Sequence, residues 1–169
     1  MKIDLISQNC NSYKANLHSH STLSDGWLTP AELKNAYKAR GYSILSITDH
    51  ELLHTHEYLD DPDFITISGY ETGIVKEPTP DFPYKKVCHL NLYSKKQTGN
   101  KIVCYRPESV LKNLNGKTLS EIEYFGTAEK AVYTPAYINH VIEEALQHDY
   151  IVSYNHPHWS LESFADFSQ

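Results

Sequence analysis

The sequence predicts an α/β fold built mainly from parallel strands, and two observations lead to this prediction. Segments with strand patterns alternate along the chain with segments that have helical patterns, as in strand–helix–strand units. The chain has 169 residues, of which 40% are hydrophobic and 21% are charged, and these values are typical of a globular domain. We therefore expect residues 1–169 to form a single domain.

The first predicted unit is a strand, a helix and a second strand. Residues 14–20 have a strand pattern that leads into a polar turn. Thr29 is expected to cap a helix, because a proline follows it and Glu32 completes a capping box. Gly41 is expected to end this helix, since glycine readily adopts the left-handed conformation there. The short apolar run 42–48 then predicts a buried parallel strand.

Two further strands are expected at 64–71 and 86–93. Side chains alternate along a strand, so His89 should share one face of the second strand with its polar neighbours. Residues 94–133 carry no obvious chemistry, although 107–116 and 118–126 each resemble a short helix. We interpret 94–133 as an insertion or lid, with plain scaffold as the equally good alternative.

The last predicted unit is a helix followed by a strand. Thr134 is expected to cap the helix 135–149, with a proline at the first helical position. Residues 150–159 have the pattern of a final strand, and Pro157 should end its ladder because proline lacks an N–H donor.

Composition excludes several classes of function. The net charge is −6 and only two arginines occur, which argues against an extended nucleic-acid-binding surface. No apolar run is long enough to span a bilayer, and no signal-peptide core is present, so no membrane partner is expected. Three cysteines without CxxC spacing predict reduced thiols in a cytoplasmic protein. No feature of the sequence decides the oligomeric state.

Histidine is unusually frequent, with ten in the chain. Because side chains alternate along a strand, His18 and His20 should point to the same face and could chelate one ion. Asp25 follows the turn and could supply an oxygen to a neighbouring ion. An HxH pair is a weak motif by itself, and two half-exposed histidines beside a turn explain it equally well.

More polar residues follow the other predicted strands, and the carboxyl ends of parallel strands meet at one rim. Glu71 is expected at the end of the third strand, where its two oxygens could bridge cations about 3.5–4 Å apart. An ordinary loop glutamate, an Asx turn and a core histidine are the alternative interpretations of these positions. The expected metal ligands are His18, His20, Asp25, His50, Glu71, His89 and His156. Asp49, His54 and His158 are expected to orient a ligand or to contact the substrate.

The composition of this ligand set indicates the kind of metal. A mixture of imidazole and carboxylate ligands suits zinc, manganese or iron better than magnesium or calcium. Seven ligands exceed what one tetrahedral ion can use, so two or three divalent transition-metal ions are predicted.

The order of these motifs resembles the polymerase and histidinol phosphatase (PHP) domain. The resemblance rests on "HSHSTLSDG", "ITDHE", "GYE", a histidine inside a strand, and "NHP", and it extends from Asn16 to about His158. It implies a distorted (β/α)7 barrel with a trinuclear metal site at its C-terminal rim. Family members usually have a late aspartate and histidine that this chain lacks, so we expect a barrel that is incomplete at its C-terminus.

The resemblance also implies a role for each ligand. His18 and His20 match ligands of a first metal, and Glu71 matches the residue that bridges it to another. The ligands that match a second metal are Asp25 and His50, and those that match a third are His89 and His156. The catalytic group would be a metal-bound water, with no protein nucleophile.

The function that we expect is metal-dependent hydrolysis of phosphate esters, with a small phosphorylated metabolite or nucleotide as substrate. Lys85, Lys86 and Arg106 are the basic residues that could reach its phosphate. Two alternatives stay open: a non-catalytic PHP-like module that binds metal or a partner, and a metal hydrolase that acts on another type of bond.

Overall fold

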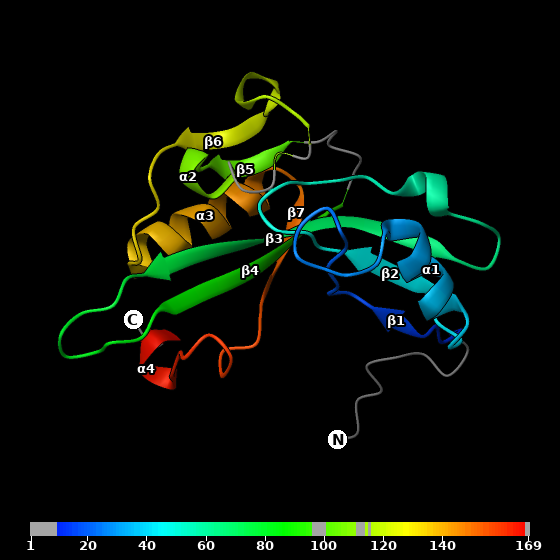
Figure 1. Ribbon diagram of the computed structural model, residues 1–169, viewed down its shortest axis with the longest axis horizontal. Coiled ribbons are helices and arrows are strands. Elements are labelled where there is room, and N and C mark those ends of the chain that lie inside the picture. Colours follow the sequence, from blue (N-terminus) through cyan, green and yellow to red (C-terminus); the bar gives the residue numbers. More distant parts are fainter. Residues whose placement is uncertain (1–9, 96–100, 111–113, 115, 168–169) are drawn as a thin grey trace.

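The computed structural model describes residues 10–95, 101–110, 114 and 116–167, and its centre is one five-stranded mixed sheet (Figure 1). The strand order is β1-β2-β3-β4-β7. Strands β1, β2 and β3 are parallel, whereas β4 runs antiparallel to both β3 and β7. These strands are β1 (Ala15–Asn16), β2 (Ile44–Ile47), β3 (Ile65–Lys76), β4 (Lys86–Ser94) and β7 (Tyr150–Tyr154).

The expected (β/α)7 barrel is wrong, because the described chain forms an open mixed sheet curved like half a barrel. In the five-stranded sheet, the described link from β1 to β2 contains an α-helix, as a parallel barrel unit requires, but the link from β2 to β3 contains just the 3-10 turn η1 (Glu57–Leu59). Between β3 and β4 lie residues 77–85, with three prolines. A parallel crossover needs a dozen or more residues, so this short segment closes an antiparallel hairpin instead.

The first helix, α1 (Pro30–Lys38), confirms the predicted capping box. The Thr29 hydroxyl accepts from the Glu32 N–H (3.3 Å), and the Glu32 carboxylate accepts from the Thr29 N–H (2.8 Å). The helix ends at Lys38 with Ala39 as its C-cap, earlier than expected, and Gly41 adopts the expected left-handed conformation (φ 77°) in the turn that follows. The helix packs on β2 over a small apolar cluster, formed by Leu33, Leu45, Ile47, Leu59 and Phe64.

The main core lies on the opposite side of the sheet from its polar face. Cys88, Leu90 and Leu92 of β4 are buried in this core, whereas His89 and Asn91 alternate with them. The helix α3 (Pro135–Gln147) begins after the predicted cap, Thr134, and covers the apolar face beside β7. The apolar residues of α3 that complete this core are Tyr137, Val141 and Ala145.

Residues 94–133 contain more regular structure than the sequence indicated. A small parallel sheet joins β5 (Ile102–Tyr105) to β6 (Tyr124–Ala128). The helix expected at 118–126 is wrong, since the 3-10 turn η3 (Leu119–Glu121) precedes β6 there. Of the helix expected at 107–116, α2 (Pro107–Val110) is present, and residues 111–113 and 115 lie outside the described chain.

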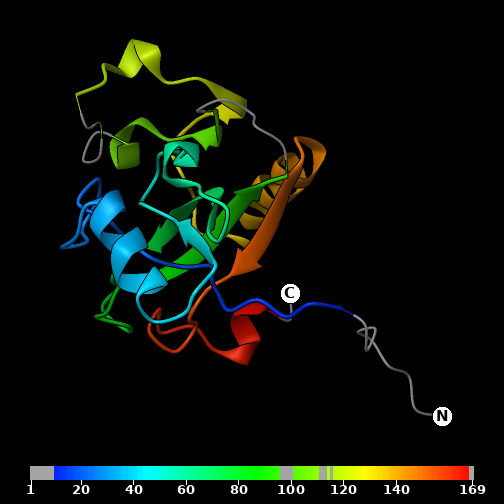
Figure 2. The ribbon, with the colours of Figure 1, turned by 90° about the vertical axis from the view of Figure 1, so that its right-hand side faces the viewer.

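The β5–β6 unit shares the main core of the sheet, to which it contributes Ile102, Val103, Cys104, Val110 and Ile122. Figures 1 and 2 place this unit at the top of the molecule and the short helix α4 (Phe164–Phe167) at the bottom. The assignment of residues 94–133 as an insertion or lid stays a prediction. Within the described residues, no helix has the length and apolarity needed to cross a bilayer.

A buried ion pair joins the β5–β6 unit to the sheet. Arg106 is 3% exposed and donates to the carboxylate of Glu51 and to the carbonyl of Gly73 (2.8 Å). The Glu51 carboxylate also accepts from the Gly73 N–H (3.0 Å) and the Thr72 hydroxyl (3.1 Å). Each charge is therefore compensated inside the protein, a condition that buried charges must meet.

We expect R106M to destabilise the fold by about 3 kcal/mol, because it leaves the Glu51 carboxylate buried without its counter-charge. Urea denaturation would measure the loss, and E51Q/R106M should recover part of it. The matched control is R40M, which removes the chain's other, exposed arginine and should change the unfolding free energy by less than about 0.5 kcal/mol. Equal effects of R106M and R40M would contradict the assignment of a buried ion pair.

Candidate metal centre

Glu71 lies in the middle of β3 rather than at its end, which corrects the strand boundary expected from the sequence. Glu71 is 1% exposed, and β3 is the central strand of the sheet. In register it stands opposite Asn91 of β4. Residues from both sides of β3 can therefore reach the Glu71 carboxylate.

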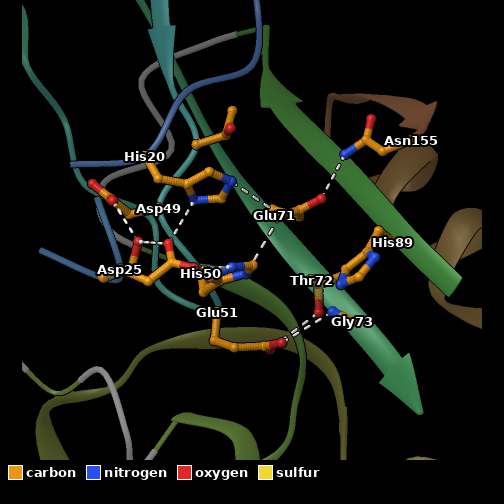
Figure 3. A network of polar contacts seen from close by, with 12 residues as sticks. His20, Asp25, Asp49, His50, Glu51, Glu71, Thr72, Gly73, His89 and Asn155 are labelled. Carbon is orange, nitrogen blue, oxygen red and sulfur yellow. Dashed lines mark hydrogen bonds and ion pairs between the residues drawn. The ribbon is translucent and has the colours of Figure 1, made fainter. Parts of the chain in front are cut away.

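The two oxygens of Glu71 face two different pairs of imidazoles. Figure 3 shows one of these pairs, His20 and His50. Oε1 lies 3.2 Å from His156 Nε2 and 3.7 Å from His18 Nε2. Oε2 lies 3.2 Å from His20 Nε2 and 3.4 Å from His50 Nδ1. The carboxylate thus has the arrangement of a group that could bridge two cations.

Backbone hydrogen bonds hold His50 beside Glu71. The Glu71 N–H donates to the Asp49 carbonyl (3.2 Å), and the Glu51 N–H donates to the Glu71 carbonyl (2.7 Å). His50 and Glu71 form a parallel bridge just beyond the end of β2. The pairing of β2 with β3 therefore extends far enough to fix this imidazole against the carboxylate.

His18 and His20 are held in place by the serine between them. Ser19 is buried, and its hydroxyl donates to the Ser46 carbonyl of β2 (2.8 Å). Its carbonyl accepts from the Thr48 N–H (2.7 Å). Because Ser19 faces β2, both histidines point the other way, with their Nε2 atoms 3.2 Å apart.

Asp49 holds the loop that carries Asp25. Among the described residues, its carboxylate forms no ion pair with an imidazole of the site. Its carboxylate accepts from the Ser21 N–H (2.7 Å) and from the hydroxyls of Ser21 and Ser24 (both 2.6 Å). Asp25 is 66% exposed and lies 3.5 Å from His20 Nδ1 and 3.5 Å from His50 Nε2. The turn therefore presents Asp25 on the side of Glu71 Oε2.

His89 and His156 share a partner that the sequence reasoning missed. Ser160 is 3% exposed, and its hydroxyl lies 3.0 Å from His89 Nδ1 and 3.5 Å from His156 Nδ1. The two rings are 5.0 Å apart. A serine oxygen has two lone pairs, so it can accept from both Nδ1–H groups and leave both Nε2 atoms for a metal. The only sequence signal was its position four residues after His156.

Two asparagines, Asn91 and Asn155, were also missed. The amide of Asn91 lies 2.5 Å from His18 Nδ1, and the amide of Asn155 lies 3.2 Å from the same atom. Asn155 also donates to Glu71 Oε1 (2.9 Å; Figure 3). Both could have been suspected from the sequence, since Asn91 shares a strand face with His89 and Asn155 belongs to "NHP".

Two residues that were expected to orient a ligand or contact substrate do not line this cavity. His54 forms a backbone bridge with Gly69, and burial lowers the pKa of its imidazole to about 4. His158 is exposed. Neither contacts a predicted ligand through its side chain in any contact found among the described residues, and their substrate roles stay predictions.

Burial and charge act in opposite directions on the groups around Glu71. Burial raises the pKa of Glu71, but the hydrogen bonds from His20 and Asn155 outweigh it and lower this pKa to about 2. Burial lowers the pKa of His18 and of His89, against the opposing charge of Glu71. Burial also lowers the pKa of His20, yet its hydrogen bond to Glu71 and the nearby charges of Glu71, Asp25 and Asp49 raise it above its usual value.

All seven expected ligands line one cavity of about 480 Å³. The lining consists of His18, His20, Asp25, His50, Glu71, His89, His156 and Trp159. Within it, two groups have ligand atoms that lie within 4.8 Å of one another and could hold a metal ion: His18–Glu71–His156 and His20–His50–Glu71. This grouping places His18 with His156 and His20 with His50, whereas the PHP resemblance placed His18 with His20.

No protein-family model matches this chain, and a search of curated proteins finds no match. The function is therefore argued below from the site itself.

Gly26 allows the HxH loop to turn, and we expect G26A to weaken metal binding at least about tenfold. A Cβ atom at Gly26 would lie 2.1 Å from the His20 carbonyl oxygen, so His20 would have to move. Titration calorimetry with Zn²⁺ or Mn²⁺ would measure the affinity. The control is G41A, which strains a φ of 77° far from the cavity and should lower stability by about 1 kcal/mol without changing metal affinity.

Ser160 should position two imidazoles, so we expect S160A to lower metal affinity by about tenfold while the fold is kept. The matched control is S163A, on the same segment, whose hydroxyl bonds Asp166 (2.8 Å) rather than a histidine. Calorimetric metal titration and circular dichroism of both variants give the comparison. Unchanged affinity in S160A would show that Ser160 does not orient these ligands.

Proposed function

We propose that this chain is a metal-dependent hydrolase of phosphate esters whose site is of the PHP type. The observation that carries the proposal is the buried Glu71 carboxylate, whose two oxygens face separate imidazole pairs. Carboxylate-bridged pairs of divalent ions are common in enzymes that hydrolyse phosphate esters. The resemblance of the ordered motifs to the PHP domain supports the same conclusion.

The residues present fit two or three divalent transition-metal ions. His18 and His156 would hold one ion with Glu71, and His20 and His50 would hold another with the same carboxylate. Asp25 would add an oxygen on the His20 side, and His89 would serve an ion on the His156 side. Zinc, manganese and iron suit such imidazole-rich sets. When bound, these ions supply the positive charge that lowers the pKa of water and neutralises phosphate oxygens.

The pKa shifts of Glu71, His18 and His89 favour the forms of these side chains that bind metals. The low pKa of Glu71 keeps the carboxylate charged at neutral pH, and the lowered pKa values of His18 and His89 keep those imidazoles neutral. Neutral imidazole nitrogens and charged carboxylates are the forms that bind metals. The described residues that line the cavity have no hydroxyl or thiol, so the attacking group that we propose is water.

Phosphate recognition would depend on the bound ions rather than on basic side chains. The lining of the cavity contains no lysine or arginine among the described residues. Arg106, a candidate for this role from its sequence position, is buried in the ion pair with Glu51. Lys86 pairs with Asp166 (2.9 Å). A substrate with a single phosphate group fits such a site better than a long polyanion.

We expect the purified chain to contain two or three transition-metal ions, measured by elemental analysis, and E71Q to lose most of them. Glutamine has one carbonyl oxygen and no charge, so it cannot serve both imidazole pairs. The control H140A removes a histidine of α3 that lies near Thr127 (3.4 Å) and is not among the residues lining the cavity, and its metal content should stay unchanged. A wild-type chain that binds no metal would overturn the proposed function.

Activity distinguishes the phosphoesterase from the two alternatives. We expect the metal-loaded chain to release phosphate from small phosphomonoesters, and both chelation and E71Q to lower the rate at least about a hundredfold. Full metal content without turnover of any phosphate ester would favour a binding module. Turnover of an amide or a carboxylic ester instead would favour a hydrolase of another bond.

A further inference from the structure

The mouth of the metal cavity carries an exposed indole. Trp159 is 80% exposed, yet it is one of the residues that line the cavity. Tryptophan is usually well buried, because its ring is the largest apolar side chain. The other tryptophan, Trp27, is 94% exposed and lies outside that lining. Trp159 therefore offers an apolar ring face beside a site that is otherwise made of imidazoles and carboxylates.

Hydrogen bonds on two sides of Trp159 hold the turn that carries it. On one side, Ser160 is buried under the imidazoles, and its N–H donates to the His156 carbonyl (3.2 Å). On the other, the Glu162 N–H donates to the Pro157 carbonyl (3.0 Å). The Glu162 carboxylate accepts from the Tyr133 hydroxyl (2.5 Å). The backbone that carries the ring is therefore ordered before a ligand arrives, which lowers the entropy cost of stacking on Trp159.

We propose that Trp159 is a stacking platform that makes the site selective for phosphate esters whose alcohol part carries a planar aromatic ring, as in a nucleoside monophosphate. This inference rests on the proposed function, which puts the phosphate at the Glu71 centre. Among the described residues that line the cavity, every side chain except Trp159 is an imidazole or carboxylate assigned to metal binding, so the indole is the group left for the non-phosphate part of a substrate. The platform acts on binding and not on the chemical step.

The test compares adenosine 5′-monophosphate with ribose 5-phosphate, which is the same molecule without its base. In W159A, the KM for adenosine 5′-monophosphate should rise about tenfold, the usual effect of losing one base–aromatic stack. The KM for ribose 5-phosphate and kcat for both should stay close to wild type. W27A removes an equally exposed indole outside the cavity and should change none of these values.

A fluorescence measurement tests the same contact without catalysis. In W27F, Trp159 is the remaining tryptophan, so adenosine 5′-monophosphate should quench its emission while ribose 5-phosphate should not. Quenching without any hydrolysis would support the stacking role of Trp159 and overturn the proposed function. Hydrolysis of both esters with equal KM, or no quenching, would overturn the platform. A sugar phosphate that binds as tightly as the nucleotide would overturn it as well.

Discussion

The structure depends on keeping one charged carboxylate, that of Glu71, inside the protein. A buried carboxylate costs several kcal/mol unless partners compensate it. Here the partners come from almost every strand: His18 and His20 follow β1, His50 follows β2, and Asn155 follows β7. The sheet order brings these strand ends around β3, so the fold and the candidate metal centre satisfy the same electrostatic requirement.

A second buried carboxylate, that of Glu51, has a structural role and lies outside the candidate metal centre. Glu51 is joined to Glu71 through the backbone, yet its charge is taken up by Arg106, Thr72 and Gly73. The Arg106 guanidinium and the Gly73 N–H only donate hydrogen bonds and do not bind metal ions. Glu71 instead faces imidazoles, which can exchange a hydrogen bond to the carboxylate for a bond to a cation. Two neighbouring acids therefore have different roles because their counter-groups differ.

Sequence reasoning predicted local features well and tertiary arrangement poorly. Cap residues such as Thr29 are predicted from a few neighbours. His18 and His20 do point the same way, as predicted, although the strand expected at 14–20 is observed only as β1, Ala15–Asn16. The barrel was wrong because strand patterns carry no information on pairing direction, and the hairpin after β3 reverses the chain. Ser160 was missed because a buried serine has no sequence signature before its neighbours are known.

The register between β3 and β4 links two properties of the protein that are usually separate. On β4, His89 and Asn91 face the metal cavity, while Leu90 and its apolar neighbours face the core. A slip by one residue would exchange these two faces, and leucines would then occupy the place of the imidazoles. A shifted register would therefore lose both the apolar packing of the core and the ligands of the centre, so the packing of the leucines of β4 also determines which side chains reach the metal cavity.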